Sequence, residues 1–238
     1  MTDNDRRPAT PAQVYGQLLK TGTSPALVWY GQDERIELSG KVLANHIAKI
    51  ANYLVDECEL EPGARVVLDL PTHWKSVAWG LAALVAGGSV VMGRDRVRDH
   101  ESGTVVVTDE PTAIETDNDD VVVALNLKSL AFAWDGELPE GVEDGAASVL
   151  SHPDALMVSG VDEYSNASFF ARAVRYVPEG ERVAVTFPTL PSALSLGYQL
   201  FSDGAGLVVI NDPVKDSQDI CSAEKAVYFE DFSRYAPM

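Results

Sequence analysis

Two pairs of polar side chains stand where ligands commonly bind to parallel sheets. Thr72 and His73 follow an apolar segment, residues 65–70, which is expected to form a buried strand that a proline ends. A similar segment, residues 183–187, precedes the second pair. In open α/β sheets ligands bind beyond the carboxyl ends of the strands, so side chains at these ends could face a ligand. The candidate ligand-facing residues are Thr72, His73, Thr189 and Ser192.

A structural explanation of the same residues is also open. The threonine after each strand can cap the helix that follows it, and Trp74 can pack into the core. His73 could instead act with a nearby carboxylate in an enzyme of changed chemistry. The sequence alone does not decide between these alternatives.

The remaining histidines do not predict a metal site. His46 lies on an expected helix, His100 and His152 lie in expected loops, and none has a second ligand at metal-binding spacing. The acidic run 117–120 lacks the glycine and the distal glutamate of a calcium loop. No Gly-x-Ser-x-Gly elbow, dinucleotide fingerprint or Walker loop is present. We therefore expect no metal, and the sequence holds no complete active site.

An internal repeat organises the elements that position these residues. Residues 63–95 match residues 180–212 without a gap, and nine of the 33 aligned pairs are identical. Unrelated sequence of this composition would give about two identities. The identical pairs include Gly63 and Gly180, Pro71 and Pro188, Gly80 and Gly197, and Gly87 and Gly204.

Each copy predicts a strand, a helix and a second strand. The first strand ends at a proline, glycine allows close approach of the helix, and Gly87 or Gly204 ends that helix in a left-handed conformation. A strand–helix–strand unit of this length makes a right-handed crossover between parallel strands. The predicted fold class is α/β, with two similar subdomains whose mostly parallel sheets are flanked by helices.

Other segments complete the expected order of elements. Thr10 and Ser39 are expected to cap helices, and a hairpin is expected over residues 26–38. Residues 137–145 are expected to form an exposed connection. We predict a disordered lead-in (1–9), a first subdomain (10–125), a connecting segment (126–153) and a second subdomain (154–238).

Composition limits the classes of partner. The net charge of −18 repels phosphate backbones and anionic lipids, so we expect neither nucleic acid nor membrane as a partner. A protein partner or a second copy of the chain is compatible with this charge. The only two cysteines, Cys58 and Cys221, form no framework of spaced pairs, which fits a cytoplasmic location.

The stretch 25–92 resembles the N-terminal part of the AMP-forming acyl-CoA synthetase superfamily. The likeness rests on Pro25–Val28 before a hairpin, on Leu38-Ser39 opening a helix, and on the turn and strand Glu61–Val66. Leu70–Thr72 and Leu81–Gly88 resemble a strand end and a helix end of the same family. The resemblance extends to about residue 212 and implies the family's fold, because these motifs belong to the scaffold.

The resemblance also implies where a phosphate loop would stand. The family has a Ser/Thr/Gly-rich loop ending in Pro-Lys-Gly there, whereas this chain keeps only Ser159 and Gly160, followed by Asp162 and Glu163. Carboxylates at this place oppose a polyphosphate, so ATP or AMP is not an expected cofactor. The family's Pro-x-x-His segment is replaced by residues 188–191, and the segments for adenine, ribose and the catalytic lysine have no counterpart before the end of the sequence.

Three hypotheses follow from the retained scaffold and the altered loop. The first is a catalytically incomplete relative that serves as a binding or assembly module. The second is a small-molecule binder with a nucleotide, acyl or CoA pocket between the repeats. The third is the enzyme of changed chemistry that uses His73.

Overall fold

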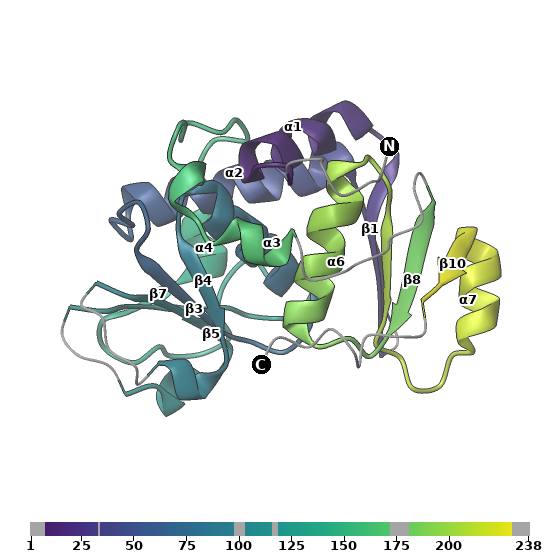
Figure 1. The fold of residues 1–238 in the computed structure, drawn as a ribbon. Helices are drawn as coiled ribbons and strands as arrows, with labels where there is room; N and C mark the ends of the chain where they lie inside the picture. Colours follow the sequence, from purple (N-terminus) through teal and green to yellow (C-terminus); the bar gives the residue numbers. More distant parts are fainter. Residues whose placement is uncertain (1–7, 33, 98–102, 116–118, 172–180, 230–238) are drawn as a thin grey trace.

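The computed structural model describes residues 8–32, 34–97, 103–115, 119–171 and 181–229. In this part the chain forms two five-stranded sheets with helices between them and around them (Figure 1). The expected lead-in up to residue 7, His100, and residues 117 and 118 of the acidic run lie outside the described residues.

The first sheet is entirely parallel. Its strands are β3 (Arg65–Asp69), β4 (Ser89–Met92), β5 (Val105–Thr108), β6 (Val121–Ala124) and β7 (Val142–Asp144). They lie in the order β4-β3-β5-β6-β7, and every neighbouring pair is parallel. The central strands are valine-rich runs that are buried on both faces, which is the pattern typical of a sheet covered on both sides.

The second sheet combines strands from both ends of the chain. Its strands are β1 (Pro25–Gly31), β2 (Glu34–Ser39), β8 (Arg182–Thr186), β9 (Leu207–Ile210) and β10 (Ala226–Tyr228). The order is β10-β8-β9-β1-β2, with β1 and β2 antiparallel and the other pairs parallel. The expected hairpin therefore forms, but it pairs with β9. The division of the sheets does not coincide with the expected segments 10–125 and 154–238.

Two helices, α3 (Trp74–Val85) and α6 (Leu190–Ser202), lie between the sheets. All twelve residues of α3 are buried, as expected for a helix covered on every side. The helices approach closely at Gly80, where a Cβ atom would stand 2.8 Å from a methyl group of Leu194. We expected the glycine to allow approach to a sheet, whereas its nearest neighbour is the other central helix.

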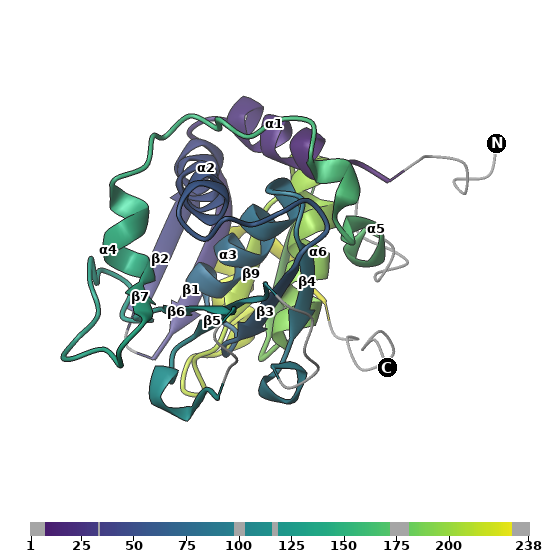
Figure 2. The same ribbon diagram turned by 90° about the vertical axis from the view of Figure 1, so that its left-hand side faces the viewer.

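Helices α1 (Pro11–Thr21) and α2 (Gly40–Asp56) lie at the amino ends of the parallel strands (Figures 1 and 2). The helix starts predicted from Thr10 and Ser39 are confirmed, because each side chain accepts a hydrogen bond from the third residue of its helix. Helix α2 leads from the end of β2 to the loop before β3, so it crosses from one sheet to the other.

The remaining elements are short. They are α4 (Gly145–Leu150), α5 (Ala167–Phe170) and α7 (Ser217–Glu224), with single 3-10 turns at Arg94–Arg96, Pro111–Ala113 and Asp162–Tyr164. The expected exposed connection over 137–145 holds for residues 137–141, which lie outside helices and strands. It is wrong for residues 142–145, because β7 and the start of α4 lie there and Gly145 is buried. Helix α7 had no counterpart among the expected elements.

The two strand–helix–strand units have the same order of elements. Pro71 and Pro188 each follow the first strand of their unit without entering a helix, and Gly87 and Gly204 have φ angles of 86° and 74°. The first strand of each unit, β3 or β8, lies between two parallel strands. One is the second strand of the unit, β4 or β9, and the other is β5 or β10. Superposition of the two units stays a prediction.

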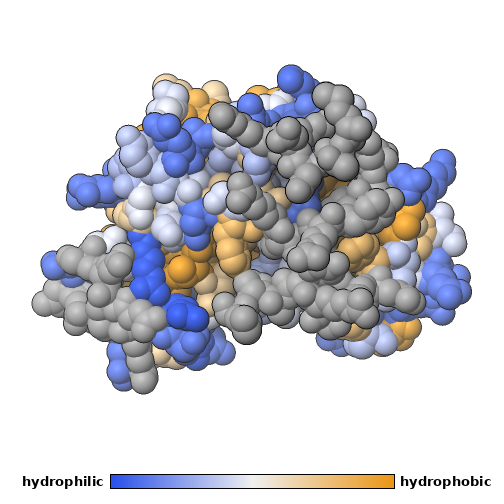
Figure 3. Space-filling model, in the orientation of Figure 1, coloured by the Kyte–Doolittle hydropathy of each residue, from blue (hydrophilic) through white to orange (hydrophobic). Residues whose placement is uncertain are grey.

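Apolar side chains gather in one main core between the sheets. This core joins residues of α1, α2, α3 and α6 to the inner faces of both sheets, and a smaller cluster lies under α7. On the face drawn in Figure 3, hydrophilic residues cover much of the two ends of the molecule, with smaller hydrophobic areas between them. The surface in this view therefore has no broad apolar face among the residues that are coloured.

Candidate functional site

The segments after β3 and β8 meet through one hydrogen bond. The Thr72 hydroxyl donates to the carbonyl oxygen of Pro188 at 2.7 Å, and the Asn211 side chain donates to the Thr72 carbonyl at 3.4 Å. The structure thus brings the two predicted strand ends together. The expected capping role of Thr72 is wrong, because α3 begins one residue later and His73 is its N-cap.

His73 is held inside the protein by its neighbours. Its Nδ1 accepts a hydrogen bond from Lys75 N at 3.2 Å, and its ring contacts the rings of Trp29 and Trp74 at centroid distances of 5.0 and 5.7 Å. Burial, with a smaller effect of the Lys75 charge, lowers the pKa of His73 to about 3. A carboxylate oxygen of Glu34 lies 3.9 Å from Nε2. A histidine with this pKa is neutral at pH 7 and a weak base.

Thr189 and Ser192 bind each other. Their hydroxyl oxygens lie 2.9 Å apart, and Thr189 Oγ1 also accepts a hydrogen bond from Ser192 N at 3.4 Å, which caps α6 as predicted. Thr189 is exposed and Ser192 is buried. The segments that carry the four candidate residues therefore meet, but in the described part of the chain their side chains form hydrogen bonds with other residues of the protein.

The segment that leads to Ser159 and Gly160 is held along α2. The buried side chain of Asn52 donates to the carbonyl oxygens of Pro153 and Ala155 at 3.3 and 2.9 Å, and it accepts from Met157 N at 2.9 Å. Ser159 and Gly160 follow this anchor and are both exposed. Because α2 lies at the amino ends of the strands, these two residues lie away from the strand ends that carry Thr72 and Thr189.

The residues after Gly160 have structural partners. An Asp162 carboxylate oxygen accepts a hydrogen bond from Ala12 N at 3.1 Å, at the first turn of α1, where the helix dipole favours a negative charge. The backbone of Val161 lies against Gly87, where a Cβ atom would be 2.5 Å from the Val161 carbonyl oxygen. The Asn166 side chain then exchanges two hydrogen bonds with the backbone of Val90, at 2.9 and 2.8 Å.

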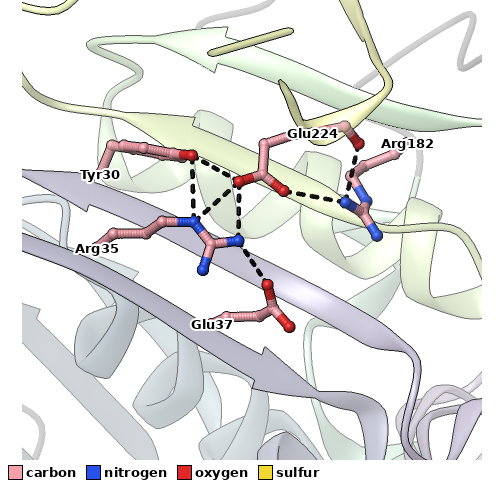
Figure 4. Close-up of polar contacts among 5 residues, drawn as sticks. All are labelled: Tyr30, Arg35, Glu37, Arg182 and Glu224. Carbon is pink, nitrogen blue, oxygen red and sulfur yellow. Dashed lines mark hydrogen bonds and ion pairs between the residues drawn. The ribbon is translucent and has the colours of Figure 1, made fainter. Parts of the chain in front are cut away.

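A polar cluster on the second sheet binds α7 to β1, β2 and β8 (Figure 4). Glu224 Oε1 accepts from the Tyr30 hydroxyl at 2.5 Å and from Arg35 Nε at 2.9 Å, and Glu224 Oε2 lies 3.1 Å from Arg182. Burial raises the pKa of Glu224, but these hydrogen bonds outweigh burial and the net shift is downward. Arg35 also contacts Glu37 at 2.5 Å. Because every charge has a partner, the cluster is suited to fastening α7 in place.

A second polar cluster lies at the carboxyl ends of β3 and β5, where the direction of strand connection reverses. Asp69 accepts from Arg94 at 3.0 and 3.1 Å and from the Thr108 hydroxyl at 2.9 Å, and Arg94 also binds Glu110 at 2.6 Å. Such reversal points are common ligand sites in open sheets. Here the arginine is already held by two carboxylates, which leaves it poorly suited to a further anion.

An apolar cavity of about 240 Å³ lies between β2, α2, α3 and α4. Its lining, which sequence reasoning did not identify, is Ile36, Leu38, His46, Ile50, Trp74, Lys75, Ala78, Trp79, Leu125, Ser129, Leu130, Ala131, Phe132, Gly145, Ala146, Val149 and Leu150. The lining comes from five separate segments, including the loop after β6. No spacing in the sequence brings them together, so only the fold reveals the cavity.

Lys75 is the buried cation of this cavity. Its Nζ donates to the carbonyl oxygens of Asn126, Lys128 and Ala131 at 2.7, 2.6 and 3.5 Å. Burial lowers the pKa of Lys75 to about 8, against a smaller opposite effect of the Glu34 charge. The three carbonyl groups fix the loop that follows β6 over the cavity.

The described residues form neither a metal cluster nor a membrane-spanning helix. Within residues 8–229, leaving out the gaps given above, no group of three His, Cys, Asp or Glu side chains is placed to hold a metal ion. No helix in the same part of the chain has the length and apolar character needed to span a bilayer.

Comparisons with known proteins identify the fold. No protein-family model matches the chain. A curated Mycobacterium tuberculosis protein, described only as a family protein, is 30% identical over 161 residues, which are 62% of this chain and 64% of that protein. The chain thus spans less than two thirds of this relative.

Solved structures match over nearly the whole chain. Brucella canis acyl-CoA synthetase has a TM-score of 0.65 and 15% identity, covering 95% of this chain and 48% of that one. The N-terminal subdomain of Klebsiella oxytoca NpsA in complex with anthranilyl-AMSN has a TM-score of 0.63 and 11% identity, covering 95% and 60%. Amide bond synthetase McbA from Marinactinospora thermotolerans has a TM-score of 0.58 and 14% identity, covering 91% and 47%. The chain therefore has the α/β fold of the N-terminal region of acyl-CoA synthetases and adenylation enzymes, as its sequence resemblance predicted.

Proposed function

We propose that this chain is a relative of the adenylate-forming enzymes that makes no acyl adenylate and serves as a binding or assembly module. The observation that carries the proposal is the position of Ser159 and Gly160. They are exposed, they follow a segment anchored to α2 by Asn52, and the next carboxylate, on Asp162, binds the first turn of α1.

The chemistry of phosphate binding supports this proposal. A triphosphate needs several donors and a cation held in place, and the loss of one well-placed donor typically costs about 3 kcal/mol of transition-state stabilisation. The segment 159–163 offers two small residues followed by two carboxylates. A loop whose aspartate already stabilises a helix start would lose that contact if it turned towards a phosphate.

Small-molecule binding is a second candidate, and the cavity beside Lys75 favours it. The related NpsA subdomain binds anthranilyl-AMSN, so this fold accommodates an aromatic ligand in that protein. The cavity here is lined from α2, α3, α4 and β2, so it lies beside the first repeat rather than between the two. The third hypothesis, an enzyme that uses His73, is less well supported, because burial keeps that histidine neutral and weakly basic.

The charge of the chain supports a protein partner or a second copy over nucleic acid or membrane. A net charge of −18 opposes binding to polyanions. We also propose a cytoplasmic location, which the two free cysteines support.

Equilibrium binding of nucleotides tests the proposed function. In a thermal-shift series with ATP, AMP and CoA, each with and without Mg²⁺, we expect no rise in melting temperature at millimolar ligand. A nucleotide that binds the folded state would raise it by mass action. A rise with ATP that Ser159→Trp abolishes, and that Ser151→Trp on the exposed end of α4 leaves intact, would overturn the proposal.

A further inference from the structure

We propose that the cavity between β2, α2, α3 and α4 binds a small, uncharged aromatic molecule that carries one hydroxyl group. This inference rests on the binding role within the proposed function and names the chemistry of the ligand. Four features support it: the size of the cavity, the nature of its walls, the polar groups free to act in it, and the carbonyl groups around its one buried cation.

The size of the cavity suits one aromatic ring with a substituent. Its volume is about 240 Å³, and it opens beside Leu130, Phe132 and Leu150, which are 78%, 69% and 51% exposed. An apolar engineered cavity of about 150 Å³ is large enough to bind benzene. A single ring with a methyl and a hydroxyl group therefore has room, and the exposed apolar side chains at the mouth could cover it.

The walls are apolar and partly aromatic. Trp74 and Trp79 of α3 lie on one side, with Ile50 of α2 and Val149 of α4 among the other lining residues. Indole rings favour edge-to-face or offset contacts with a second ring, and each such pair adds about 0.5–1.5 kcal/mol beyond the area buried. An aromatic ligand gains more from these walls than an aliphatic one of equal volume.

Two polar side chains are free to bind a hydroxyl group. His46 lines the cavity, contacts the Trp74 ring at 5.3 Å and makes no hydrogen bond within the described part of the chain. Burial, with a smaller effect of the Lys75 charge, lowers the pKa of His46, so the ring is neutral at pH 7 and presents one acceptor nitrogen. Ser129 Oγ accepts from Trp74 Nε1 at 3.1 Å, and its own proton remains available to a ligand.

The surroundings of Lys75 disfavour an anionic ligand. The ammonium group already donates to three backbone carbonyl oxygens, so its charge is solvated by dipoles before any ligand enters. A carboxylate that approached Nζ would also approach the negative ends of these carbonyl groups. Glu34 adds negative charge nearby, and the neutral His46 adds no positive charge to oppose it. An uncharged ligand avoids this repulsion and the cost of desolvating a carboxylate.

A matched series of ligands tests the proposal on the whole chain. Isothermal titration at pH 7 with p-cresol, toluene and 4-methylbenzoate compares the same ring with a hydroxyl group, no polar group and a carboxylate. We expect p-cresol to bind at least tenfold more tightly than either of the others. Equal or tighter binding of 4-methylbenzoate would overturn the uncharged class, and no binding of p-cresol would overturn the site.

Three variants locate the binding. Ala146→Leu fills the cavity from α4, whereas Ala147→Leu adds the same side chain to an exposed neighbour that does not line it. We expect the first variant to lose p-cresol binding and the second to keep it, with unchanged circular dichroism in both. His46→Leu should remove the preference for p-cresol over toluene. Binding that Ala146→Leu leaves intact would place the ligand elsewhere and contradict the proposal.

The test of p-cresol binding and the test of nucleotide binding can fail independently. If p-cresol does not bind the cavity, the expected lack of nucleotide binding still stands, because the cavity contains none of residues 159–163. Nucleotide binding with an intact p-cresol site would overturn the proposed function and leave the cavity proposal standing.

Discussion

A carboxylate oxygen of Asp162 accepts a hydrogen bond from the backbone N–H of Ala12 at 3.1 Å, across 150 residues of sequence. The aspartate stands where the resemblance places a phosphate loop, and its partner is the first turn of α1. The acidic side chain thus stabilises the N-terminus of a helix. This contact explains how a carboxylate is accommodated at the place where the resemblance implies phosphate donors.

Replacing Asp162 should destabilise the fold modestly. Asp162→Ala removes both the acceptor for Ala12 N and a negative charge near the N-terminus of α1, so we expect unfolding free energy to fall by about 1 kcal/mol. Glu163→Ala is the matched control, because Glu163 is exposed and has no hydrogen-bond partner in the described residues. Urea denaturation measures the unfolding free energy of both variants. An equal effect of the two variants would show that the contact is not stabilising.

Replacing Asn52 should destabilise the fold far more than replacing Asn45, which lies on the same helix. Asn52→Ala leaves two carbonyl groups and one N–H of the segment 153–157 without their partner, so we expect a loss of about 2–4 kcal/mol. Asn45→Ala removes a single exposed contact of 3.3 Å to Asp154 and should change stability by less than about 0.5 kcal/mol. Proteolysis at residues 153–163 should accelerate only in the first variant. Equal resistance to proteolysis in both variants would contradict the anchoring of this segment to α2.

Replacing glycine by alanine should change stability in opposite directions at two helix positions. Gly80→Ala places a methyl group 2.8 Å from Leu194, so overpacking should cost about 1–3 kcal/mol. Gly16→Ala on α1 meets no atom within 4 Å and should stabilise the protein by about 0.5–1 kcal/mol through helix propensity. Adding Leu194→Val to the first variant should recover part of the loss. Thermal melts that show stabilisation at position 80 would mean that the central helices pack less closely.

The stability should depend on pH through His73. Its pKa is about 3 in the folded protein and 6.5 ordinarily, so between these values the unfolded chain binds a proton that the folded protein does not. Stability is therefore lost as pH falls below 6.5. Between pH 7 and pH 5 this one group should remove about 2 kcal/mol.

His73→Asn is the variant that isolates this effect. Asparagine can still cap α3 but does not titrate, so the variant should lose about 2 kcal/mol less than the parent between the two pH values. Urea unfolding at pH 7 and pH 5 gives the comparison. Parallel losses in both proteins would show that His73 is protonated in the fold or that its burial is incomplete.

Much of the fold could be predicted because its signals are local. Prolines after β3 and β8, glycines after α3 and α6, and the caps Thr10 and Ser39 each act within a few residues of where they stand. The pairing of the β1–β2 hairpin with β9 could not be predicted in this way. It depends on contacts between segments about 180 residues apart, whereas the predicted boundaries placed the hairpin in the first subdomain.

The candidate site was predicted less well for the same reason. The sequence located the strand ends that carry Thr72 and Thr189, but the bond from Thr72 to Pro188 is a tertiary contact. The cavity beside Lys75 is assembled from five segments with no common spacing. Its lysine stands on a helix that the sequence correctly placed, yet nothing local shows that its amine reaches the carbonyl groups of a loop about 50 residues away.

Pyrophosphate exchange measures directly whether the chain forms acyl adenylates. The purified chain is incubated with ATP, Mg²⁺, labelled pyrophosphate and a broad panel of carboxylic acids, beside an active acyl-CoA synthetase as the positive control. Because two carboxylates follow Ser159 and Gly160 and Asp162 is bound to α1, we expect no exchange above the protein-free background with any acid. Exchange above background that disappears in Ser159→Ala would contradict the account, since it would show a working phosphate loop at this position.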